Sequence, residues 1–566
     1  MLDRATPDRN TPDCAILDRD TPEQPTPCVN VDLYEHGGFL TFDDCLPTLL
    51  VLLLTVATIL CRPLLPVDET RYVAVAWEMR DSGDFFVSHL NGDTYAHKPP
   101  LLFWMINAIW LCFGESEFAA RSIVVPLGII SAWLTRRLAS HLYSFDRVAV
   151  TSAPLIQTSC LIWLFFSPLL MFDVLLLVCT QAGMCGILQL SRGSSLRGWC
   201  FLTAGLGLGA LAKGPVILVH LLPVAIFGPW WSDSIRRTPV RYFLTITLAL
   251  VAGATLALAW AITSASKGGE AYAEELLWGQ TAGRVVTSFA HRESWWWYLP
   301  ILPLCFLPWI LIWVSWSRPT SLPATLPVSV HPGRFAFCWF VGTVALLSCI
   351  SGKQTHYLIP ELPAFALYAA GVLSGTTVSH RHKLKWLIGS GTLFAGTLPV
   401  VVNHFPLFAT SGLKDVCPTP TCLPLWVCGV GVILCRSQET RSLVATISIA
   451  AVMFVVTLNV GLSVSFWPEF DMRPLANHVQ ALEQNQVPVA WFGNYHGQLH
   501  FSGRLHKPIE ELLTEHEATV WIDTHPTGRI IVPHQPPELQ SLNLKAEFAI
   551  EVRRGLTKHT LVVLKM

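Results

Sequence analysis

Apolar runs dominate the chain from about residue 44 to residue 464 and alternate with short polar stretches. A helix that crosses a bilayer needs about 20 apolar residues, with a range of about 17–25. The runs therefore predict a polytopic α-helical membrane protein with about thirteen spans. We place them near residues 44–62, 119–138, 148–168, 173–190, 198–212, 215–231, 242–263, 298–316, 335–351, 357–375, 384–402, 423–435 and 442–464.

Two segments do not fit a simple alternation of spans and loops. The run Pro99–Phe113 is apolar, but at about 1.5 Å per residue it covers only about 22 Å of a hydrocarbon core about 30 Å thick. We expect an interfacial or re-entrant helix there. The stretch 198–231 is too long for one span and is interrupted by Lys213-Gly214-Pro215, which predicts two short spans joined by an outer turn.

The two ends of the chain have a different pattern. Residues 1–43 hold a loose Asp-Arg-x-Thr-Pro repeat that cannot bury a core, so we expect a disordered tail. After residue 464, short β-like runs predict a small α/β domain over residues 465–566. The expected strands are Val487–Phe492, Ala518–Ile522, Arg529–Val532, Ala546–Glu551 and Thr560–Leu564, with a helix in Glu510–His516.

Basic residues set the expected orientation. Lys and Arg gather in one series of short alternate loops, which places those loops and the N-terminal tail in the cytoplasm. The longer loops 63–118, 264–297 and 403–422 then face the outside, together with the C-terminal domain. For a bacterial inner membrane, this outer side is the periplasm.

Composition narrows the classes of function. The chain is 52% hydrophobic and 14% charged, against about 25% charged residues in soluble domains, which excludes a water-soluble enzyme. The net charge of −1 gives no support to a nucleic-acid partner. Most of the 16 cysteines lie inside apolar runs, whereas Cys417 and Cys422 lie in a polar loop and are a candidate disulfide.

Carboxylates at the outer ends of the spans are the first candidates for chemistry. Asp68 and Glu69 follow directly on the first span, and Asp173 lies between apolar residues at the start of the fourth. An acid in apolar surroundings is costly unless it faces a polar site. The alternative interpretations are solvated loop acids for Asp68 and Glu69 and a helix N-cap for Asp173.

Cations and histidines lie at the same predicted end of the molecule. They are Lys98, Lys213, Arg284, Lys353, His97 and His291. Taken singly, a lysine there can be a snorkelling side chain, and the aromatic run Trp295–Tyr298 fits an interfacial belt. Acids beside several cations at a membrane surface suit a phosphate-bearing lipid. The cations would hold the phosphate and stabilise its leaving charge, and a carboxylate would orient or deprotonate an acceptor.

Several of these motifs resemble a known family. Asp68-Glu69-Thr70-Arg71-Tyr72, Gly83-Asp84, Asn91-Gly92 and Tyr95-x-x-Lys98-Pro99-Pro100 resemble the first outer loop of the lipid A 4-amino-4-deoxy-L-arabinose transferases. That group, with the protein O-mannosyltransferases, belongs to the GT-C class of membrane glycosyltransferases. Glu117–Arg121, Asp173, Lys213-Gly214-Pro215, His291 and Lys353–Pro363 match in order, so the resemblance covers residues 44–375.

The resemblance implies a GT-C fold, a polyprenyl-phosphate-linked sugar donor and an inverting transfer on the periplasmic side. It makes Asp68 and Asp173 the catalytic-site acids. It also implies that Tyr95, Lys98 and Tyr357 line the phosphate and sugar cavity. The acids and cations that the predicted topology gathers at the outer face add Glu69, Lys213, Arg284 and Lys353 to the candidate substrate-binding residues. His291 matches a family metal ligand. The family often has Glu before Lys-Pro-Pro where this chain has His97, and two histidines could still bind zinc.

Other functions stay open at this stage. Within the transferase hypothesis, the acceptor is a lipid A-like phosphate, another envelope glycan or lipid, or a protein hydroxyl. A secondary transporter or flippase is the alternative, although we see no internal repeat of the kind that such proteins often have. An envelope scaffold is the third hypothesis, but it gives Asp173 and Lys98 no role.

Overall fold

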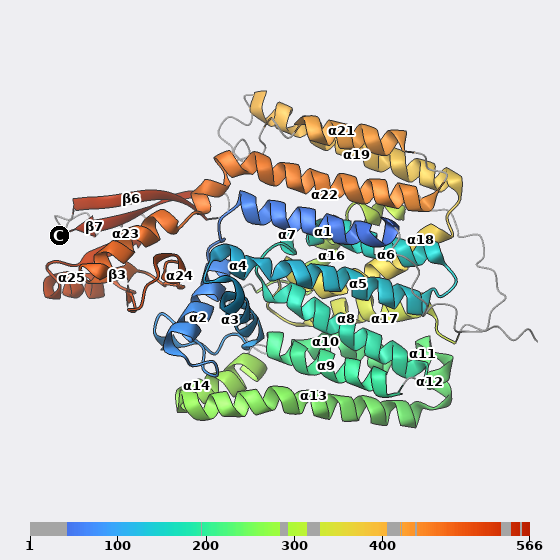
Figure 1. Cartoon of the computed structure of the whole chain (residues 1–566), viewed down its shortest axis with the longest axis horizontal. Helices are drawn as coiled ribbons and strands as arrows, with labels where there is room; N and C mark the ends of the chain where they lie inside the picture. The colour runs from blue at the N-terminus through green and yellow to red at the C-terminus, as the bar shows by residue number, and fades with distance from the viewer. Residues whose placement is uncertain are drawn as a thin grey trace, which may run out of the picture. The chain divides into compact units, whose positions relative to one another are not determined.

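The computed structural model describes residues 42–193, 195–283, 292–313, 329–404, 419, 422–435, 439–533, 545–554 and 557–565. Residues 1–41 of the predicted N-terminal tail and Cys417 lie outside these residues, whereas residues 42 and 43, also predicted in the tail, belong to helix α1 (Phe42–Cys61). Long helices run side by side through most of the described chain (Figure 1). Seven of them are long and apolar enough to cross a membrane: Glu117–Leu142, Phe172–Ser191, Pro239–Gly268, Pro332–Cys349, Thr355–Ser374, Val378–His404 and Thr440–Ser465.

The helical segments follow the predicted spans. They are α1 (Phe42–Cys61), α5 (Val124–Leu142), α6 (Arg147–Ser159), α7 (Leu161–Phe166), α8 (Phe172–Ser191), α9 (Ser195–Lys213), α10 (Val216–Ile226), α11 (Gly228–Trp231), α12 (Asp233–Arg237), α13 (Pro239–Gly268), α16 (Tyr298–Cys305), η2 (Trp309–Ile312), α17 (Pro332–Cys349), η3 (Thr355–Glu361), α18 (Leu362–Ser374), α19 (Val378–His404), α21 (Cys422–Leu434) and α22 (Thr440–Ser465). The prediction of a polytopic helical membrane protein is thus confirmed.

Six of the thirteen predicted spans are shorter, less apolar or interrupted in the described chain. The segment 148–168 breaks at Cys160, whose backbone is extended between α6 and α7. The segment 298–316 holds the short α16, with Pro303 inside it, and the 3-10 helix η2, which begins after Pro308. Proline removes a backbone donor and crowds the preceding turn, so apolar runs that contain it do not form one continuous helix.

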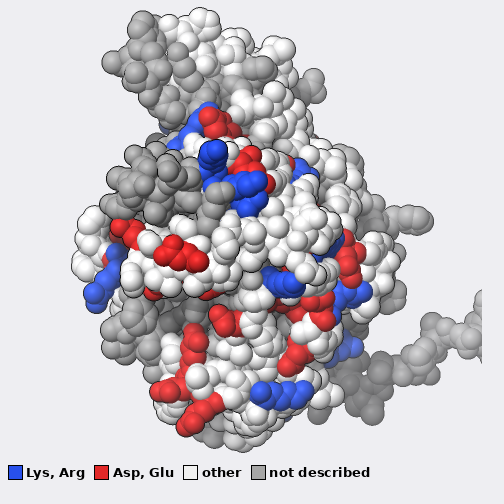
Figure 2. Space-filling view, turned by 90° about the vertical axis from the view of Figure 1, so that its left-hand side faces the viewer, with Lys and Arg blue, Asp and Glu red and all other residues white. Residues whose placement is uncertain are grey.

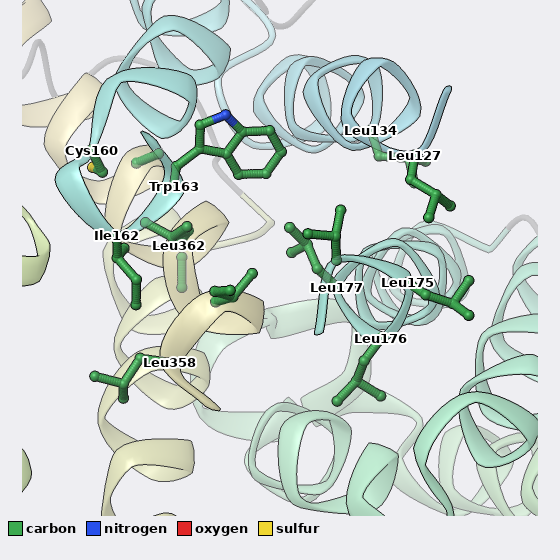
Figure 3. Packing of buried hydrophobic residues seen from close by; sticks show 14 of the residues in the cluster. Leu127, Leu134, Cys160, Ile162, Trp163, Leu175, Leu176, Leu177, Leu358 and Leu362 are labelled. Atoms are coloured by element: carbon green, nitrogen blue, oxygen red, sulfur yellow. The ribbon is translucent and has the colours of Figure 1, made fainter. Parts of the chain in front are cut away.

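Helix α8 is the centre of the bundle. It packs against α5, α9, α10 and η3. In its most apolar 18-residue stretch 83% is buried inside the protein, compared with 17% in the corresponding stretch of α13. Glycines let α8 and α9 approach closely: a Cβ added to Gly186 would lie 2.5 Å from the backbone nitrogen of Leu202. Small residues at such crossings are typical of membrane helices. Figure 3 shows the apolar core beside α8, where Trp163, Leu177 and Leu362 lie close to one another.

The first loop is an ordered structure between the first two long segments. It comprises α2 (Asp68–Ser82), β1 (His89–Leu90), β2 (Asp93–Thr94), α3 (Leu101–Phe113) and α4 (Glu117–Ser122). Asn91 and Gly92 join β1 and β2 with φ angles of 57° and 84°, the left-handed conformation that favours Asn-Gly in tight hairpins. The helix expected within Pro99–Phe113 is present as α3.

The C-terminal part is the predicted α/β domain. It contains η6 (Trp467–Phe470), α23 (Arg473–Gln484), β3 (Val489–Phe492), α24 (His500–Gly503), β4 (Glu510–Leu512), α25 (Glu515–Thr524), β5 (Arg529–Pro533), β6 (Lys545–Arg554) and β7 (Thr557–Lys565). The sheet order is β4-β3-β5-β7-β6. Strands β4 and β5 are parallel to β3, whereas β7 is antiparallel to β5 and β6.

Two of the segments predicted in this domain were wrong. Glu510–Leu512, expected in a helix, is strand β4, and Ala518–Ile522, expected as a strand, lies in helix α25. The cause is a capping box, in which Thr514 and Glu517 each bond the other's backbone N–H. This motif starts a helix at Glu515 whatever the β propensity of the residues that follow.

The C-terminal domain packs on the first loop. The Trp77 indole of α2 donates a hydrogen bond to the Leu505 carbonyl at 3.1 Å. Asn91 donates to the Ile509 carbonyl and accepts from the Ile509 N–H, both at 2.8 Å. The guanidinium of Arg504 lies 4.8 Å from the Trp77 ring centre. These contacts brace the loop that carries Asp68 and Lys98.

Candidate functional site

Asp173 lies in the first turn of α8, next to the extended residues that precede the helix. Its side chain is 2% exposed. Oδ1 accepts a hydrogen bond from Lys213 Nζ at 2.6 Å, and Oδ2 lies 3.8 Å from His356 Nε2. The positive end of the α8 dipole favours a carboxylate at this position. Three helical elements therefore meet at one buried acid.

Lys213 reaches Asp173 from the last turn of α9. Gly214, at a φ of 69°, ends α9 and Pro215 precedes α10, so the chain reverses just after the lysine. The ammonium also lies 4.4 Å from the Tyr357 ring centre. A cation between a carboxylate and an aromatic face is held in place by both. The predicted break at Lys213-Gly214-Pro215 is confirmed.

His356 was not among the residues selected from the sequence. It lies on η3 beside Tyr357, with ring centres 4.9 Å apart, and its other aromatic neighbour is Phe166. Its side chain is 12% exposed. The only signal in the sequence is its place within the Lys353–Pro363 motif. A lone histidine beside a tyrosine at the end of a span is equally typical of an interfacial belt.

Lys98 comes to the same cluster from the first loop. Its Nζ lies 5.8 Å from the ring centre of Phe172, the residue before Asp173, and its charge stabilises the Asp173 carboxylate. Tyr72 of α2 meets the same Phe172 ring edge-on, with centres 4.9 Å apart. Tyr95 is buried and packs on the ring of His97 at 5.0 Å. The first loop thus seats its predicted donor-binding residues beside α8.

Asp68 is more exposed than Asp173. It forms an ion pair with Arg71 at 2.6 Å, and their side chains are 47% and 20% exposed. The Asp68 charge also acts on His356 and Tyr72. Burial, reinforced by the Asp68 carboxylate, raises the pKa of Tyr72 well above its ordinary value. Asp68 therefore borders the Asp173 cluster on its open side.

Glu69 has a different environment, although it is the next residue. Both of its oxygens bond Arg62, at 2.5 and 3.1 Å, and they also accept from the backbone N–H groups of Leu65 and Leu170. Burial favours the neutral acid, but the Arg62 guanidinium outweighs it and lowers the pKa of Glu69 to about 2. The pair joins the end of α1, the start of α2 and the segment before α8.

Lys353 is buried and bonds backbone groups. Its Nζ donates to the carbonyls of Ile350 at 2.5 Å and Glu293 at 3.1 Å. Arg292 and Gly352 form an isolated antiparallel bridge at the same place. In this structure Lys353 therefore ties the segment that precedes α16 to the end of α17.

Of the two predicted metal ligands, His97 is described and His291 lies outside the described residues. The predicted substrate-binding residue Arg284 also lies outside them. His97 Nε2 lies 3.1 Å from Glu275 Oε1 of the π-helix η1 (Glu275–Gly283), which follows α14 (Glu270–Glu274). Within the described ranges, no group of three or more His, Cys, Asp or Glu side chains is placed to hold a metal ion. His97 and Glu275 supply two of the donors that zinc accepts.

Charged side chains are scattered among uncharged ones on the face of the molecule that includes the first loop and the C-terminal domain (Figure 2). Lys and Arg lie among Asp and Glu across this face, which suits contact with water. The cluster around Asp173 lies where this face meets the apolar bundle, because α8 begins there.

Comparisons with known proteins agree with this picture. Residues 97–260 match the family model described as dolichyl-phosphate-mannose-protein mannosyltransferase. The undecaprenyl phosphate-alpha-4-amino-4-deoxy-L-arabinose arabinosyl transferase of Edwardsiella ictaluri is 29% identical over 369 residues, which are 62% of this chain and 64% of that protein. One from Pseudomonas fluorescens is 30% identical over 56% of this chain and 54% of its own length. The chain thus spans 64% and 54% of the lengths of these two relatives, less than two thirds in each case.

Solved structures show the same fold. The crystal structure of ArnT from Cupriavidus metallidurans bound to undecaprenyl phosphate has a TM-score of 0.68 at 17% identity, covering 91% of this chain and 97% of that one. Its apo form gives a TM-score of 0.70 at 16% identity. The resemblance found in the first-loop motif is confirmed, and this chain has the GT-C membrane fold of the arabinose transferases.

Proposed function

We propose that this protein transfers a sugar from a polyprenyl-phosphate donor to an envelope acceptor at the periplasmic face of a bacterial inner membrane. The observation that carries the proposal is the meeting of Asp173, Lys213 and His356 with Lys98 of the first loop. Acids beside cations at the end of a helix bundle suit a membrane-bound phosphate ester. The relatives named for undecaprenyl-phosphate arabinose, and the ArnT structure bound to undecaprenyl phosphate, support this donor class.

The transfer is a single displacement at the anomeric carbon. The bond from this carbon to the donor phosphate breaks, and its electron pair leaves with the polyprenyl phosphate. A bond to the acceptor oxygen forms on the opposite face, which inverts the configuration. Lys98 and Lys213 neutralise the charge that develops on the leaving phosphate. Asp173 holds Lys213 in place and orients the sugar.

The acceptor decides how much base assistance the reaction needs. A phosphate acceptor is already an anion at neutral pH, so no proton has to be removed. A hydroxyl acceptor gives its proton to a base, and Asp68 is the carboxylate on the open side of the cluster. We favour a lipid A-type phosphate acceptor, because the relatives compared above are named as transferases of 4-amino-4-deoxy-L-arabinose.

The test is a transfer assay on the purified full chain in lipid. Radiolabelled undecaprenyl-phosphate sugars serve as donors, with a lipid A phosphate in one arm and a hydroxyl-bearing envelope lipid or protein in the other. We expect donor-dependent label in the phosphate arm. Asp68→Asn should slow a hydroxyl transfer on the order of 100-fold or more and a phosphate transfer much less. No transfer with any polyprenyl-phosphate sugar overturns the proposal.

The proposed orientation has its own test. Reporter fusions at Gly193, after α8, and at Ser502, in α24, should report the cytoplasm and the periplasm respectively. The opposite pair of readings contradicts a periplasmic site.

Zinc binding at His97 also stays a proposal. His97 and Glu275 are adjacent, and the match of His291 to a family ligand suggests a third donor. Metal analysis of the purified protein, compared with His97→Ala, tests it: we expect zinc in the first and less in the second. Equal metal content in the two proteins contradicts the role of His97.

A further inference from the structure

A histidine and a glutamate that the proposed transfer does not use lie inside the helix bundle. His220 of α10 and Glu361 at the end of η3 are joined by a hydrogen bond of 2.5 Å between Nδ1 and Oε1. Their side chains are 1% and 0% exposed. Ionisable residues within membrane segments are rare because they are costly, and they mark functional regions by default.

The pair lies directly behind the Asp173 cluster. His220 follows Lys213 by seven residues and is the fifth residue of α10. Both Lys213 and Asp173 interact electrostatically with it. Glu361 closes the segment that carries His356 and Tyr357. The hydrogen bond thus links η3, which carries His356, to α10, the helix that follows the turn after Lys213.

One proton between His220 Nδ1 and Glu361 Oε1 makes the pair neutral, whichever of the two atoms holds it. This matters because a lone carboxylate or imidazolium in the bundle would be strongly destabilising. Glu361 also faces the Thr343 hydroxyl of α17, which itself donates to the Val219 carbonyl at 3.4 Å. Three elements, α10, η3 and α17, therefore meet in one directional polar contact.

We propose that His220 and Glu361 are a positioning pair, whose hydrogen bond fixes η3 against α10 and so sets the places of His356, Tyr357 and Lys213 around Asp173. The inference rests on the proposed transfer reaction. Apolar side chains of similar volume would hold the helices together as well, and often better. They would not fix the axial and rotational placement of η3, which a short hydrogen bond does.

Four variants of the full-length protein test this inference in the donor-dependent transfer assay. Glu361→Gln keeps a hydrogen-bonding side chain of the same shape. Glu361→Leu removes the bond and leaves His220 alone. The double change His220→Leu with Glu361→Leu restores a uniformly apolar contact. Ser448→Ala is the matched control, because Ser448 makes buried hydrogen bonds to Ser159 and Leu155 at another helix contact.

We expect Glu361→Gln and Ser448→Ala to keep kcat close to that of the wild type. Glu361→Leu should lower kcat roughly 10- to 100-fold, the scale of a small misplacement of reacting groups. The double variant should fold at least as stably as Glu361→Leu, as judged by thermal unfolding, yet keep the low kcat. In both Leu variants the donor KM should change less than kcat, because Lys98 of the first loop is unaltered.

The opposite outcomes overturn the inference. If the double variant regains the wild-type kcat, the pair serves stability alone. If Glu361→Leu is folded and as active as the wild type, or Glu361→Gln is as inactive as Glu361→Leu, the hydrogen bond does not position the site. If the wild-type protein transfers no sugar, the result contradicts the proposed function and not the positioning role of the pair.

Discussion

Two buried carboxylates lie where the first loop meets the helix bundle, and their surroundings differ. Glu69 accepts hydrogen bonds from Arg62 and from the backbone of Leu65 and Leu170. Asp173 receives one ammonium at 2.6 Å and has an imidazole 3.8 Å from its other oxygen. Both side chains are 2% exposed.

Burial alone therefore does not mark a catalytic acid. The partner of Glu69, Arg62, is 1% exposed, whereas the two partners of Asp173 are each 12% exposed. The side chains that contact Asp173 are thus closer to solvent than the side chain that contacts Glu69. We infer that Glu69 holds the junction together and that Asp173 belongs to the chemistry.

The largest expected effect is on stability, at Glu69. Glu69→Gln leaves the buried Arg62 without its anion, which should cost about 3–5 kcal/mol of unfolding free energy. Thermal unfolding and the yield of monodisperse protein measure this loss. Glu117→Gln is the control, because Glu117 also pairs with an arginine but is 23% exposed. If Glu69→Gln is as stable as the wild type, Glu69 does not hold the junction between the first loop and the helix bundle together.

At Asp173 we expect the reverse: little loss of folding and a large loss of rate. Asp173→Asn keeps the shape and removes the charge that holds Lys213, so transfer should fall on the order of 100-fold or more. Asp146→Asn is the matched control, since Asp146 caps α6 by accepting from the Ala149 N–H. If Asp173→Asn turns over normally, Asp173 is only a helix-terminal acid like Asp146.

Lys98 should show a smaller effect, on donor affinity. Lys98→Ala should weaken donor binding by roughly 1.5–3 kcal/mol, the scale of a hydrogen bond to a charged group. Lys98→Arg should recover only part of it, because a planar guanidinium does not replace a compact ammonium. Lys267→Ala is the control, as Lys267 also lies over an aromatic ring, that of Phe86. If Lys98→Ala binds the donor with the affinity of the wild type, Lys98 only anchors the loop to the membrane.

The smallest effect is the acid dependence of stability. The folded-state pKa of Glu69 is about 2, below its ordinary value of 4.5. The ion pair with Arg62 thus contributes its full stability above pH 4.5 and loses it as the pH falls towards 2. The stability difference between the wild type and Glu69→Gln should shrink across that window. A difference that stays constant down to pH 2 contradicts the depressed pKa.

The sequence predicted the placement of the helices well, because apolar length is a direct property of the chain. The break at Lys213-Gly214-Pro215 and the helix after Pro100 followed from proline and glycine. The number of full-length spans was predicted less well from the sequence, because breaks such as the one at Cys160 depend on packing. The capping box of Thr514 and Glu517 is readable in the sequence, and it outweighs the β propensity of the residues that follow.

The residues of the candidate site could be predicted from the sequence, but the contacts between them could not. Asp173, Lys213 and Lys98 were selected from their positions, and the structure brings them together. Adjacent residues in one motif, Asp68 and Glu69, take different environments because the partner of Glu69 comes from the end of α1. The links from His356 to Asp173 and from His220 to Glu361 join distant segments, which a single sequence does not reveal.

The central claim is that the first loop and the helix bundle form one phosphate-binding site, with Lys98 from the loop and Lys213 from α9. Donor affinity measured for Lys98→Ala, Lys213→Ala and the double variant, in the same lipid, tests it most directly. The account predicts that the two losses are not additive, because both cations act on the same phosphate. Strictly additive losses, or no loss at either lysine, would contradict a shared site.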